Sequence, residues 1–481
     1  MVATVKGVRI ERSSIIIELD KPTCLVSREG AKRIAPSYTQ TAQSGCEIWF
    51  NLASCQKGGC LSGEWLLEGA QAQPFESISA DFSKGSCRFA VDISCCEGNV
   101  VIKVDYSRTK VGVKDRITTL GLRTPYVLGR LFKGKKSRVL FASETRSSLS
   151  GNMEYVVSAA EGDFGGKEVL CSFKAQKSRL LYYLKTAFMA GRCDTVVVDD
   201  YFPLIYRLNF GNNRVFQLWH ACGAFKAVGY SRLGKSGAAQ PDDITHRNYT
   251  HVTVSSEQIV PFYAEAFGIP ADRLIATGVP RTDIFFDKAV ADQKQSEFYE
   301  KFPQFKGRQI FLFAPTFRGD GFNSAHYPFE MIDFAGLAEF CRKNNGAFIF
   351  KLHPFVKDFA LPDGYGDVFA DASEVREIND LLFAADVLIT DYSSVIYEFS
   401  LLSRPIIFYT YDLAEYCKSR DFYMPIEQYA ACGTVNSSEE LVELLSSGGY
   451  KTMTADIIRS HSMSACDGKS AKRVSDMIFE K

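Results

Sequence analysis

The chain has 481 residues, of which 46% are hydrophobic and 23% are charged. This composition excludes a disordered chain, and the length predicts two or three domains with large cores. The 56 basic and 56 acidic side chains cancel, which argues against wholesale nucleic-acid binding and restricts any electrostatic function to local clusters.

The N-terminal residues 1–7 lack the basic and apolar regions of a signal peptide, and no uncharged apolar stretch approaches the roughly 20 residues that span a bilayer. We therefore expect the chain to remain in the cytosol. Half of the 14 cysteines lie at irregular spacings near the N-terminus, at Cys24, Cys46, Cys55, Cys60, Cys87, Cys95 and Cys96. We expect buried free thiols, with a metal site as the alternative.

Residues 1–115 predict a small β-rich module. Short strands are expected at 9–12, 14–19, 46–50, 88–93 and 99–104, separated by Gly, Ser and Lys turns. A basic connector follows at 116–137, and Lys and Arg outnumber acidic residues in it and beside it, from Lys110 through Arg123 to Lys136. It is either a solvated linker or a segment that contacts an anionic surface.

From residue 138 onwards, apolar strands alternate with helical stretches. The first series has strands at 139–142, 195–200, 215–219 and 251–254, and the second at 309–315, 347–354, 386–391 and 405–409. A helix is expected at 259–267, with Ser255 and Gln258 as a capping box and Gly268 as its end. This pattern predicts parallel sheets covered on both faces, in two α/β halves at 138–290 and 291–481.

Polar residues stand at four strand ends: 219–220, 314–318, 351–354 and 390–394. Ser393 and Ser394 precede a helix-like run, so their hydroxyls and the N–H groups of the helix start can hold an anion such as a phosphate. Arg318 offers a planar fork for phosphate oxygens, and His353 can donate to the same group or to a leaving group. Each residue alone also fits an ordinary structural role, but their joint occurrence at strand ends favours a site in the cleft between the halves.

Other chemistries have weaker support. The sequence contains no G-x-G-x-x-G, which argues against a nicotinamide-dependent enzyme. Two acidic pairs, 199–200 and 242–243, are either ligands for a divalent cation or exposed turn residues. Metal dependence is therefore left open, and no metal ligand is assigned.

At these residues the sequence resembles the CDP-glycerol glycerophosphotransferase family, the teichoic-acid and capsule polyol-phosphate transferases. The resemblance covers about residues 136 to 430. It is carried by the stretches 219–226, 314–318, 351–354, 386–394, 404–412 and 421–423. One departure is Ala221-Cys-Gly223, where Gly-Thr-Pro is commoner in the family. The resemblance implies a GT-B fold, with two Rossmann-like α/β domains facing a cleft.

The resemblance also implies roles for individual residues. His220 is expected to act as the base on an acceptor hydroxyl, and His353, Arg318, Ser393 and Ser394 to bind the phosphates of a CDP-polyol donor. We count His220 and His353 as catalytic. Lys226, Lys351 and Asp391, which lie in the same stretches, join Arg318 and the serine pair as expected substrate-binding residues.

The family's acceptors are lipid-linked polymers, so the resemblance implies a peripheral protein at the cytoplasmic face of the membrane, with no nucleic-acid partner. Two stretches suit such a surface: the basic connector and residues 174–189, which mix cations with apolar and aromatic side chains. For 174–189 an ordinary amphipathic helix covering the first sheet is the alternative. A nucleotide-sugar glycosyltransferase on the same fold and a non-catalytic polymer-binding protein stay open as other functions.

Overall fold

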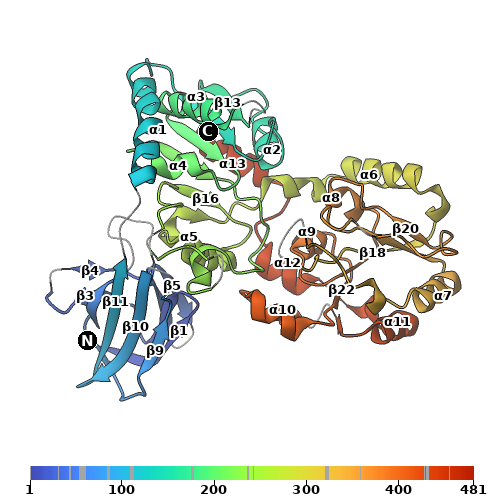
Figure 1. Cartoon of the computed structure of the whole chain (residues 1–481), viewed down its shortest axis with the longest axis horizontal. Coiled ribbons are helices and arrows are strands. Elements are labelled where there is room, and N and C mark those ends of the chain that lie inside the picture. Colours follow the sequence, from blue (N-terminus) through green and yellow to red (C-terminus); the bar gives the residue numbers. More distant parts are fainter. Residues whose placement is uncertain are drawn as a thin grey trace. The chain divides into compact units, whose positions relative to one another are not determined.

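The computed structural model describes residues 2–30, 32–42, 45–53, 61–83, 87–108, 113–174, 178–235, 238–241, 243–319, 324–357, 359–426, 428–429, 433–453 and 455–480. It contains two compact units. The first unit comprises Met1–His220, Ala227–Ala276 and Lys472–Lys481, and the second comprises Ala221–Lys226 and Thr277–Ala471. Figure 1 shows the chain coloured along its sequence.

The N-terminal part of the first unit contains two sheets of mainly antiparallel strands (Figure 1). The first sheet has the order β5 (Tyr38–Ala42), β6 (Gly45–Asn51), β2 (Ser14–Leu19), β1 (Ala3–Glu11) and β8 (Ala70–Ala72). The second has the order β4 (Arg33–Ile34), β3 (Leu25–Ser27), β7 (Gly63–Leu67), β11 (Asn99–Arg108), β10 (Cys87–Cys96) and β9 (Ile78–Asp81).

The predicted strands of this part are confirmed. Along β10, Phe89, Val91 and Ile93 are buried while the residues between them are more exposed. This alternation lets one face of the strand enter a core, because successive side chains of a strand point to opposite sides. Val91 pairs with Val104 across the ladder, so β11 presents its apolar residues to the same side.

The β-rich part is joined to the following α/β part by a buried carboxylate. Glu265 belongs to α5 (Val260–Phe267) and has no exposed surface. One of its oxygens accepts hydrogen bonds from the Ser13 backbone N–H (3.0 Å) and the Ser14 hydroxyl (2.9 Å). The other accepts from Arg12 Nε (2.9 Å) and the Ser231 hydroxyl (2.6 Å). A single buried charge therefore ties the β1–β2 turn to the α/β part.

The start of α5 differs from the sequence-based expectation. Ser256, and not Ser255, is the N-cap, and its hydroxyl accepts from the backbone N–H of Gln258 at 3.1 Å. A short 3-10 turn, Glu257–Ile259, precedes the α-helix. The predicted end is confirmed, since Gly268 adopts a left-handed conformation with φ 61°, which glycine tolerates well.

Most of the basic connector is a helix, α1 (Val113–Leu131), so the expectation of a solvated linker is wrong there. Leu122, Tyr126 and Gly129 form its inner face and are buried. Figure 1 shows α1 beside α3 (Arg179–Gly191), and the inner face of α1 contacts this helix. A Cβ atom on Gly129 would collide with the carbonyl oxygen of Phe188, so glycine permits the close approach of the two helices. Lys110 lies outside the described residues.

The α/β part of the first unit has a parallel six-stranded sheet. Its order is β13 (Glu168–Phe173), β12 (Arg138–Ser143), β14 (Thr195–Val198), β15 (Arg214–Gln217), β16 (His251–Thr253) and β17 (Leu274–Ile275). Its helices are α1, α2 (Asn152–Ser158), α3, α4 (Pro203–Arg207) and α5. The C-terminal helix α13 (Ser470–Phe479) returns to this sheet, where Val474 and Ile478 share a core with Phe141 and Phe216.

The second unit has another parallel six-stranded sheet, confirming the predicted α/β pattern. Its order is β20 (Phe369–Asp371), β19 (Gly346–Phe350), β18 (Gln309–Phe313), β21 (Val387–Thr390), β22 (Ile406–Tyr409) and β23 (Thr434–Val435). The helices of this unit are α6 (Lys288–Lys301), α7 (Phe334–Asn344), α8 (Ile378–Leu382), α9 (Val395–Ser400), α10 (Leu413–Ser419), α11 (Ser438–Ser447) and α12 (Asp456–Ser462).

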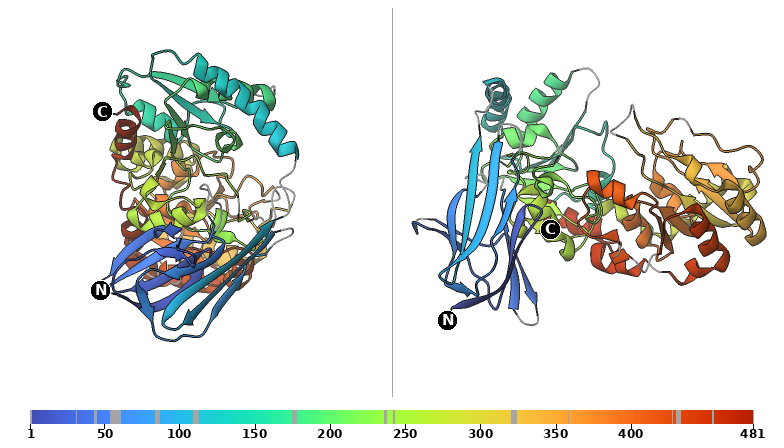
Figure 2. Two further views of the ribbon diagram at one scale, coloured as in Figure 1. Left: turned by 90° about the vertical axis from the view of Figure 1, so that its left-hand side faces the viewer. Right: turned by 60° about the horizontal axis from the view of Figure 1, so that its bottom comes forward.

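Both faces of this second sheet are covered. Along β18, Ile310 and Leu312 enter one hydrophobic cluster, which includes residues of α9 and α12, while Phe311 and Phe313 enter another, which includes residues of α7 and α11. The strand order reverses between β18 and β21, and in open α/β sheets ligands bind at such a reversal, beyond the carboxyl ends of the strands. Figure 2 gives two further views of these layers.

Within the described residues, no helix combines the length and apolar character needed to cross a bilayer. None of the eleven described cysteines forms a disulfide, and Cys46, Cys87, Cys193, Cys222, Cys341 and Cys466 are buried. Cys55 and Cys60, which were also expected to be buried thiols, lie outside the described residues.

Glu265→Ala should lower the stability of the first unit, because it leaves Arg12 without its buried carboxylate. Breaking a buried pair from one side typically costs about 3–5 kcal/mol. Urea denaturation measures the change, and Glu18→Ala is the control, because Glu18 pairs with Arg9 on the surface and should contribute at most about 1 kcal/mol. Equal unfolding midpoints for the two variants would refute the importance assigned to Glu265.

Candidate active site

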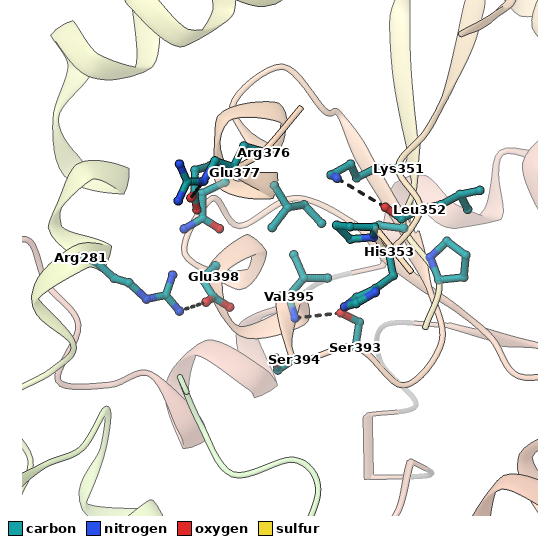
Figure 3. A pocket seen from close by; sticks show the side chains of 15 residues that line it. Arg281, Lys351, Leu352, His353, Arg376, Glu377, Ser393, Ser394, Val395 and Glu398 are labelled. Atoms are coloured by element: carbon teal, nitrogen blue, oxygen red, sulfur yellow. Dashed lines mark hydrogen bonds and ion pairs between the residues drawn. The ribbon is translucent and has the colours of Figure 1, made fainter. Parts of the chain in front are cut away.

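A cavity of about 320 Å³ lies at the carboxyl edge of the second unit's sheet. Three loops supply much of its lining: Ala314 and Pro315 follow β18, Lys351 and His353 follow β19, and residues 393–395 follow β21. These loops surround the reversal of strand order, where open α/β sheets bind ligands. Figure 3 shows the side chains that line the cavity.

Lys351 is nearly buried at the root of the β19 loop. Its Nζ donates to the backbone carbonyl of Ser373 at 3.0 Å, and a longer contact of 3.4 Å joins it to the Leu352 carbonyl (Figure 3). Burial lowers the pKa of this ammonium group, although Asp371 and Glu377 oppose the change. Lys351 therefore brings a positive charge to the wall of the cavity while it holds its own loop in place.

The hydrogen bonding of His353 defines which ring nitrogen carries the proton. Its Nδ1 accepts from the backbone N–H of Phe355 at 3.2 Å. Burial and the charge of Lys351 lower the pKa of the imidazole, which favours the neutral form at neutral pH. A neutral ring that accepts at Nδ1 carries its proton on Nε2, so His353 offers an N–H donor at Nε2.

The two serines of the β21 loop differ in their bonding. The Ser393 hydroxyl accepts from the backbone N–H of Val395 at 3.4 Å (Figure 3), which is a local turn contact. Ser394 is the N-cap residue of α9, but its side chain makes no cap hydrogen bond, and the residue is exposed. The Ser394 hydroxyl is therefore not committed to capping the helix.

A buried ion pair that the sequence analysis did not predict also lines the cavity. Arg281 donates to Glu398 on α9 (Figure 3), and a second contact of 3.6 Å joins Arg281 to the Cys222 sulfur. Burial raises the pKa of the Cys222 thiol well above its usual value, so the sulfur stays protonated. Glu398 Oε2 is buried, and the Cys222 thiol interacts with this carboxylate.

Arg318 lies outside the lining of this cavity, in a network of carboxylates and tyrosines. Its guanidinium donates twice to Asp412, from Nε at 2.6 Å and from Nη2 at 2.9 Å. Its Nη1 lies 2.9 Å from Asp391 Oδ2. Burial works against the charge of Arg318, but the hydrogen bond to Asp412 and the charge of Asp391 outweigh it and raise the pKa. The Arg318 guanidinium is therefore already bound by two carboxylates.

Asp391 and Lys226 belong to the same network. Asp391 is buried, and its Oδ1 accepts from the backbone N–H of Thr316 at 2.7 Å, which links the loops after β18 and β21. The Lys226 ammonium lies 5.3 Å from the centre of the Tyr416 ring. Burial lowers the pKa of Lys226 to about 8, despite the attraction of Asp391. Lys226 thus provides an amine that changes charge near neutral pH.

His220 lies in the first unit, after β15. Its Nδ1 is 3.4 Å from Asp200 Oδ1. Burial alone would raise the pKa of the Asp200 carboxyl, but the hydrogen bond and charge of His220 outweigh it and lower that pKa. A carboxylate at Nδ1 favours the proton there and leaves the Nε2 lone pair as the basic atom. The contact between Asp200 and His220 is another that the sequence did not reveal.

The backbone before His220 is unusual. Trp219 has a positive φ of 24°, a conformation that bulky residues seldom adopt. The Gln217 side-chain oxygen accepts from the Trp219 backbone N–H at 3.0 Å, and Asn152 donates to the Trp219 carbonyl at 3.0 Å. Strained backbone that the surrounding contacts hold in place is common at functional sites.

Asp199 and Asp200, the acidic pair after β14, have different partners. Asp199 is buried and pairs with Arg146, so the expectation of an exposed turn residue is wrong for it. Asp200 pairs with His220. In the described part of the chain, no group of three or more His, Cys, Asp or Glu side chains is arranged to hold a metal ion. Asp242, from the other acidic pair, lies outside the described residues.

The predicted site residues thus fall into three groups. The cavity brings together Lys351, His353, Ser393 and Ser394. Arg318, Asp391 and Lys226 form a buried network in the same unit. His220 lies in the other unit with Asp200.

Comparison with known proteins identifies relatives along most of the chain. The family model of CDP-glycerol:poly(glycerophosphate) glycerophosphotransferase matches residues 126–480. The teichoic acid ribitol-phosphate polymerase TarL of Staphylococcus aureus is 42% identical over 352 residues, which are 72% of this chain and 63% of that protein. The teichoic acid poly(ribitol-phosphate) polymerase of Bacillus spizizenii is 41% identical over 358 residues, 73% of this chain and 58% of that protein.

A solved structure shows the same fold. The wall teichoic acid polymerase TagF superposes with a TM-score of 0.60 at 20% identity, over 76% of this chain and 95% of the solved chain. The chain spans about three fifths of the length of the two ribitol-phosphate polymerases that it matches. Because the family model covers well over half of the residues, this chain belongs to the CDP-glycerol:poly(glycerophosphate) glycerophosphotransferase family.

Proposed function

We propose that this protein transfers a polyol phosphate from a CDP-polyol to a hydroxyl of a membrane-anchored teichoic acid acceptor and releases CMP. The cavity that collects Lys351, His353 and the serine pair carries the proposal, because it offers donors for a diphosphate at a strand-order reversal. Ribitol phosphate is the favoured unit, because both polymerases compared above are named for it.

In the proposed reaction, the acceptor hydroxyl attacks the phosphorus that carries the polyol. A new phosphorus–oxygen bond forms, the bond to the oxygen shared with the CMP phosphate breaks, and that oxygen leaves with CMP. The acceptor proton passes to Nε2 of His220, whose Nδ1 is directed by Asp200. The Nε2–H of His353 donates to a phosphate oxygen or to the leaving group.

The other predicted residues serve the donor in this proposal. Ser393, Ser394 and Lys351 bind its phosphates, and Arg318, Asp391 and Lys226 shape the neighbouring wall. No metal ligand is included in the proposed site.

The proposed domain arrangement is the GT-B type, with an acceptor domain at 138–290 and a donor domain at 291–481 that face a cleft, except that residues 277–290 belong to the compact second unit and residues 472–481 to the first. Residues 1–115 would be a separate β-rich domain. The acceptor's lipid anchor implies that the protein works at the cytoplasmic face of the membrane. Among the residues that the structure describes, eight of the fourteen exposed large hydrophobic side chains lie at 117–132 and 180–181, on or next to α1 and α3, which supports contact with a lipid surface.

His220→Ala should bind CDP-ribitol nearly as well as the parent, because the histidine is assigned to the acceptor. Turnover should fall by about 10²–10⁴-fold, as is typical for a lost general base. A base must be unprotonated to work, so the parent's rate should decrease at low pH and this decrease should flatten in the variant. Calorimetry and product mass measurement test both effects. If the variant keeps full turnover, or if it folds but no longer binds the donor, His220 is not the base. His353 then becomes the candidate base.

Asp200→Asn should lower turnover at least about tenfold, because the amide no longer favours the proton on Nδ1 of His220. The double variant with His220→Ala should be no slower than His220→Ala alone, since the two residues act as a unit. Asp272→Asn, an exposed change in the same unit, is the control. Additive losses in the double variant would show that Asp200 acts on something other than His220.

Ser394→Ala should weaken CDP-ribitol binding by about tenfold, as expected for one hydrogen bond to a charged group. Its thermal stability should not change, because the hydroxyl makes no cap bond. Ser437→Ala provides the opposite control, since Ser437 caps α11 with a bond from Glu440 N–H at 3.2 Å; it should lose stability and keep donor affinity. Unchanged affinity in Ser394→Ala would remove this residue from the site.

Contact with a lipid surface should be partly electrostatic. Clustered Lys and Arg near an anionic surface contribute about 1 kcal/mol each and are screened by salt. Vesicle sedimentation should therefore show stronger binding to anionic than to neutral vesicles and a decrease with salt. Leu131→Asp on α1 should reduce binding, while Val2→Asp, an equally drastic change at an exposed residue of the β-rich part, should not. Equal binding to both vesicle types would count against this contact.

A further inference from the structure

A second cavity, of about 430 Å³, lies in the first unit, and none of its lining residues belongs to the proposed active site. Helix α1 contributes Thr119, Leu120 and Arg123, helix α4 contributes Tyr206 and Arg207, and the loop before β16 contributes Ile244 and Arg247. Its volume is in the range of small-molecule sites. Figure 1 shows α1 and α4 in this part of the unit.

Three guanidinium groups meet at this cavity, and each is positioned by a hydrogen bond. Arg123 Nε donates to the Arg207 carbonyl at 2.9 Å, and Arg207 Nη1 donates to the Thr119 hydroxyl at 3.0 Å. Arg247 Nη2 donates to the Tyr206 carbonyl at 2.5 Å. These bonds hold the three arginine side chains at the cavity, and they link α1, α4 and the loop before β16.

The charged side chains that line the cavity in the described part of the chain are all positive. Among the residues that the structure describes, three arginines and no carboxylate line the cavity. The described carboxylate of the adjoining loop, Asp243, accepts from the backbone N–H of Thr245 at 2.7 Å and from the Thr245 hydroxyl. Converging guanidiniums of this kind suit phosphate oxygens, which accept in a planar, paired geometry.

The rim of the cavity is apolar. The side chains of Leu120 and Ile244 are 69% and 38% exposed, and Ile117, one helical turn before Leu120, is 67% exposed. From Leu120 the exposed apolar residues continue along α1 to Val127 and Leu131, at spacings that place them on one side of the helix. A ligand that combined a phosphate with a hydrocarbon chain would satisfy both the arginines and this apolar strip.

We propose that this cavity binds the phosphate group of a lipid, with the lipid's chain lying along the exposed apolar side of α1. Charge and apolar complementarity together favour a lipid over a polyol-phosphate polymer, because the polymer has no hydrocarbon to cover Leu120 and Ile244. The inference rests on the proposed contact with a lipid surface. Two sources share this chemistry, a prenyl phosphate and an anionic phospholipid.

Binding of soluble lipid phosphates to the full chain tests the proposal. Farnesyl phosphate and dihexanoyl phosphatidylglycerol, each below its micelle concentration, are titrated by calorimetry without any CDP-polyol. We expect at least one to bind, and the tighter of the two identifies the source. In Arg123→Gln/Arg247→Gln, affinity should fall by at least about tenfold. Arg130→Gln, on the same helix but outside the cavity, should change it by less than about twofold.

Leu120→Ser provides a second test that leaves every arginine in place. It should weaken the binding of the lipid phosphate and leave the affinity for inorganic phosphate unchanged. The proposal is overturned if neither lipid binds, or if the double arginine variant binds both lipids like the parent. It is also overturned if a short ribitol-phosphate oligomer binds as tightly as the lipids, which would indicate a polymer site. None of these outcomes depends on transferase activity, so the proposed reaction succeeds or fails separately.

Discussion

The strands of the second unit's sheet are buried on both faces, and the positions of the functional groups follow from this constraint. Ile310 and Leu312 pack to one side of β18 and Phe311 and Phe313 to the other, which leaves no room for a polar side chain within the strand. Polar residues are therefore restricted to strand ends. Parallel strands bring their carboxyl ends to one edge, so loops that are distant in sequence meet there.

The electrostatic balance near that edge depends on buried pairs. Arg318 is bound by Asp391 and Asp412, and the Tyr392 hydroxyl also donates to Asp412, at 2.9 Å. A phosphate that approached this guanidinium would compete with two carboxylates already in place. These contacts fit a positioning role, because Asp391 also receives the Thr316 N–H of the β18 loop. The donors that line the cavity, Lys351, His353 and Ser394, are the more direct candidates for ligand contact.

Sequence reasoning located the strand ends well because a buried strand leaves a local signal, a run of apolar residues that stops at a polar one. The pairing of Arg281 with Glu398 left no such signal, since 117 positions separate the two residues and only the tertiary fold unites them. The helix α1 was missed for another reason. Its charged and exposed residues suggested a linker, although the buried positions Leu122, Tyr126 and Gly129 recur at helical spacing.

Local contacts distinguish the two histidines, whose expected roles came from their positions at strand ends and from the family resemblance. Asp200 faces Nδ1 of His220 and favours the proton there, which makes Nε2 a base. A backbone N–H occupies Nδ1 of His353 and places the proton on Nε2, which makes the same atom a donor. Phosphoryl transfer needs one group that accepts a proton from the attacking hydroxyl and another that stabilises charge on phosphate or leaving group. These contacts therefore favour opposite tautomers of the two imidazoles, and exchanging the roles proposed for them would require breaking both contacts.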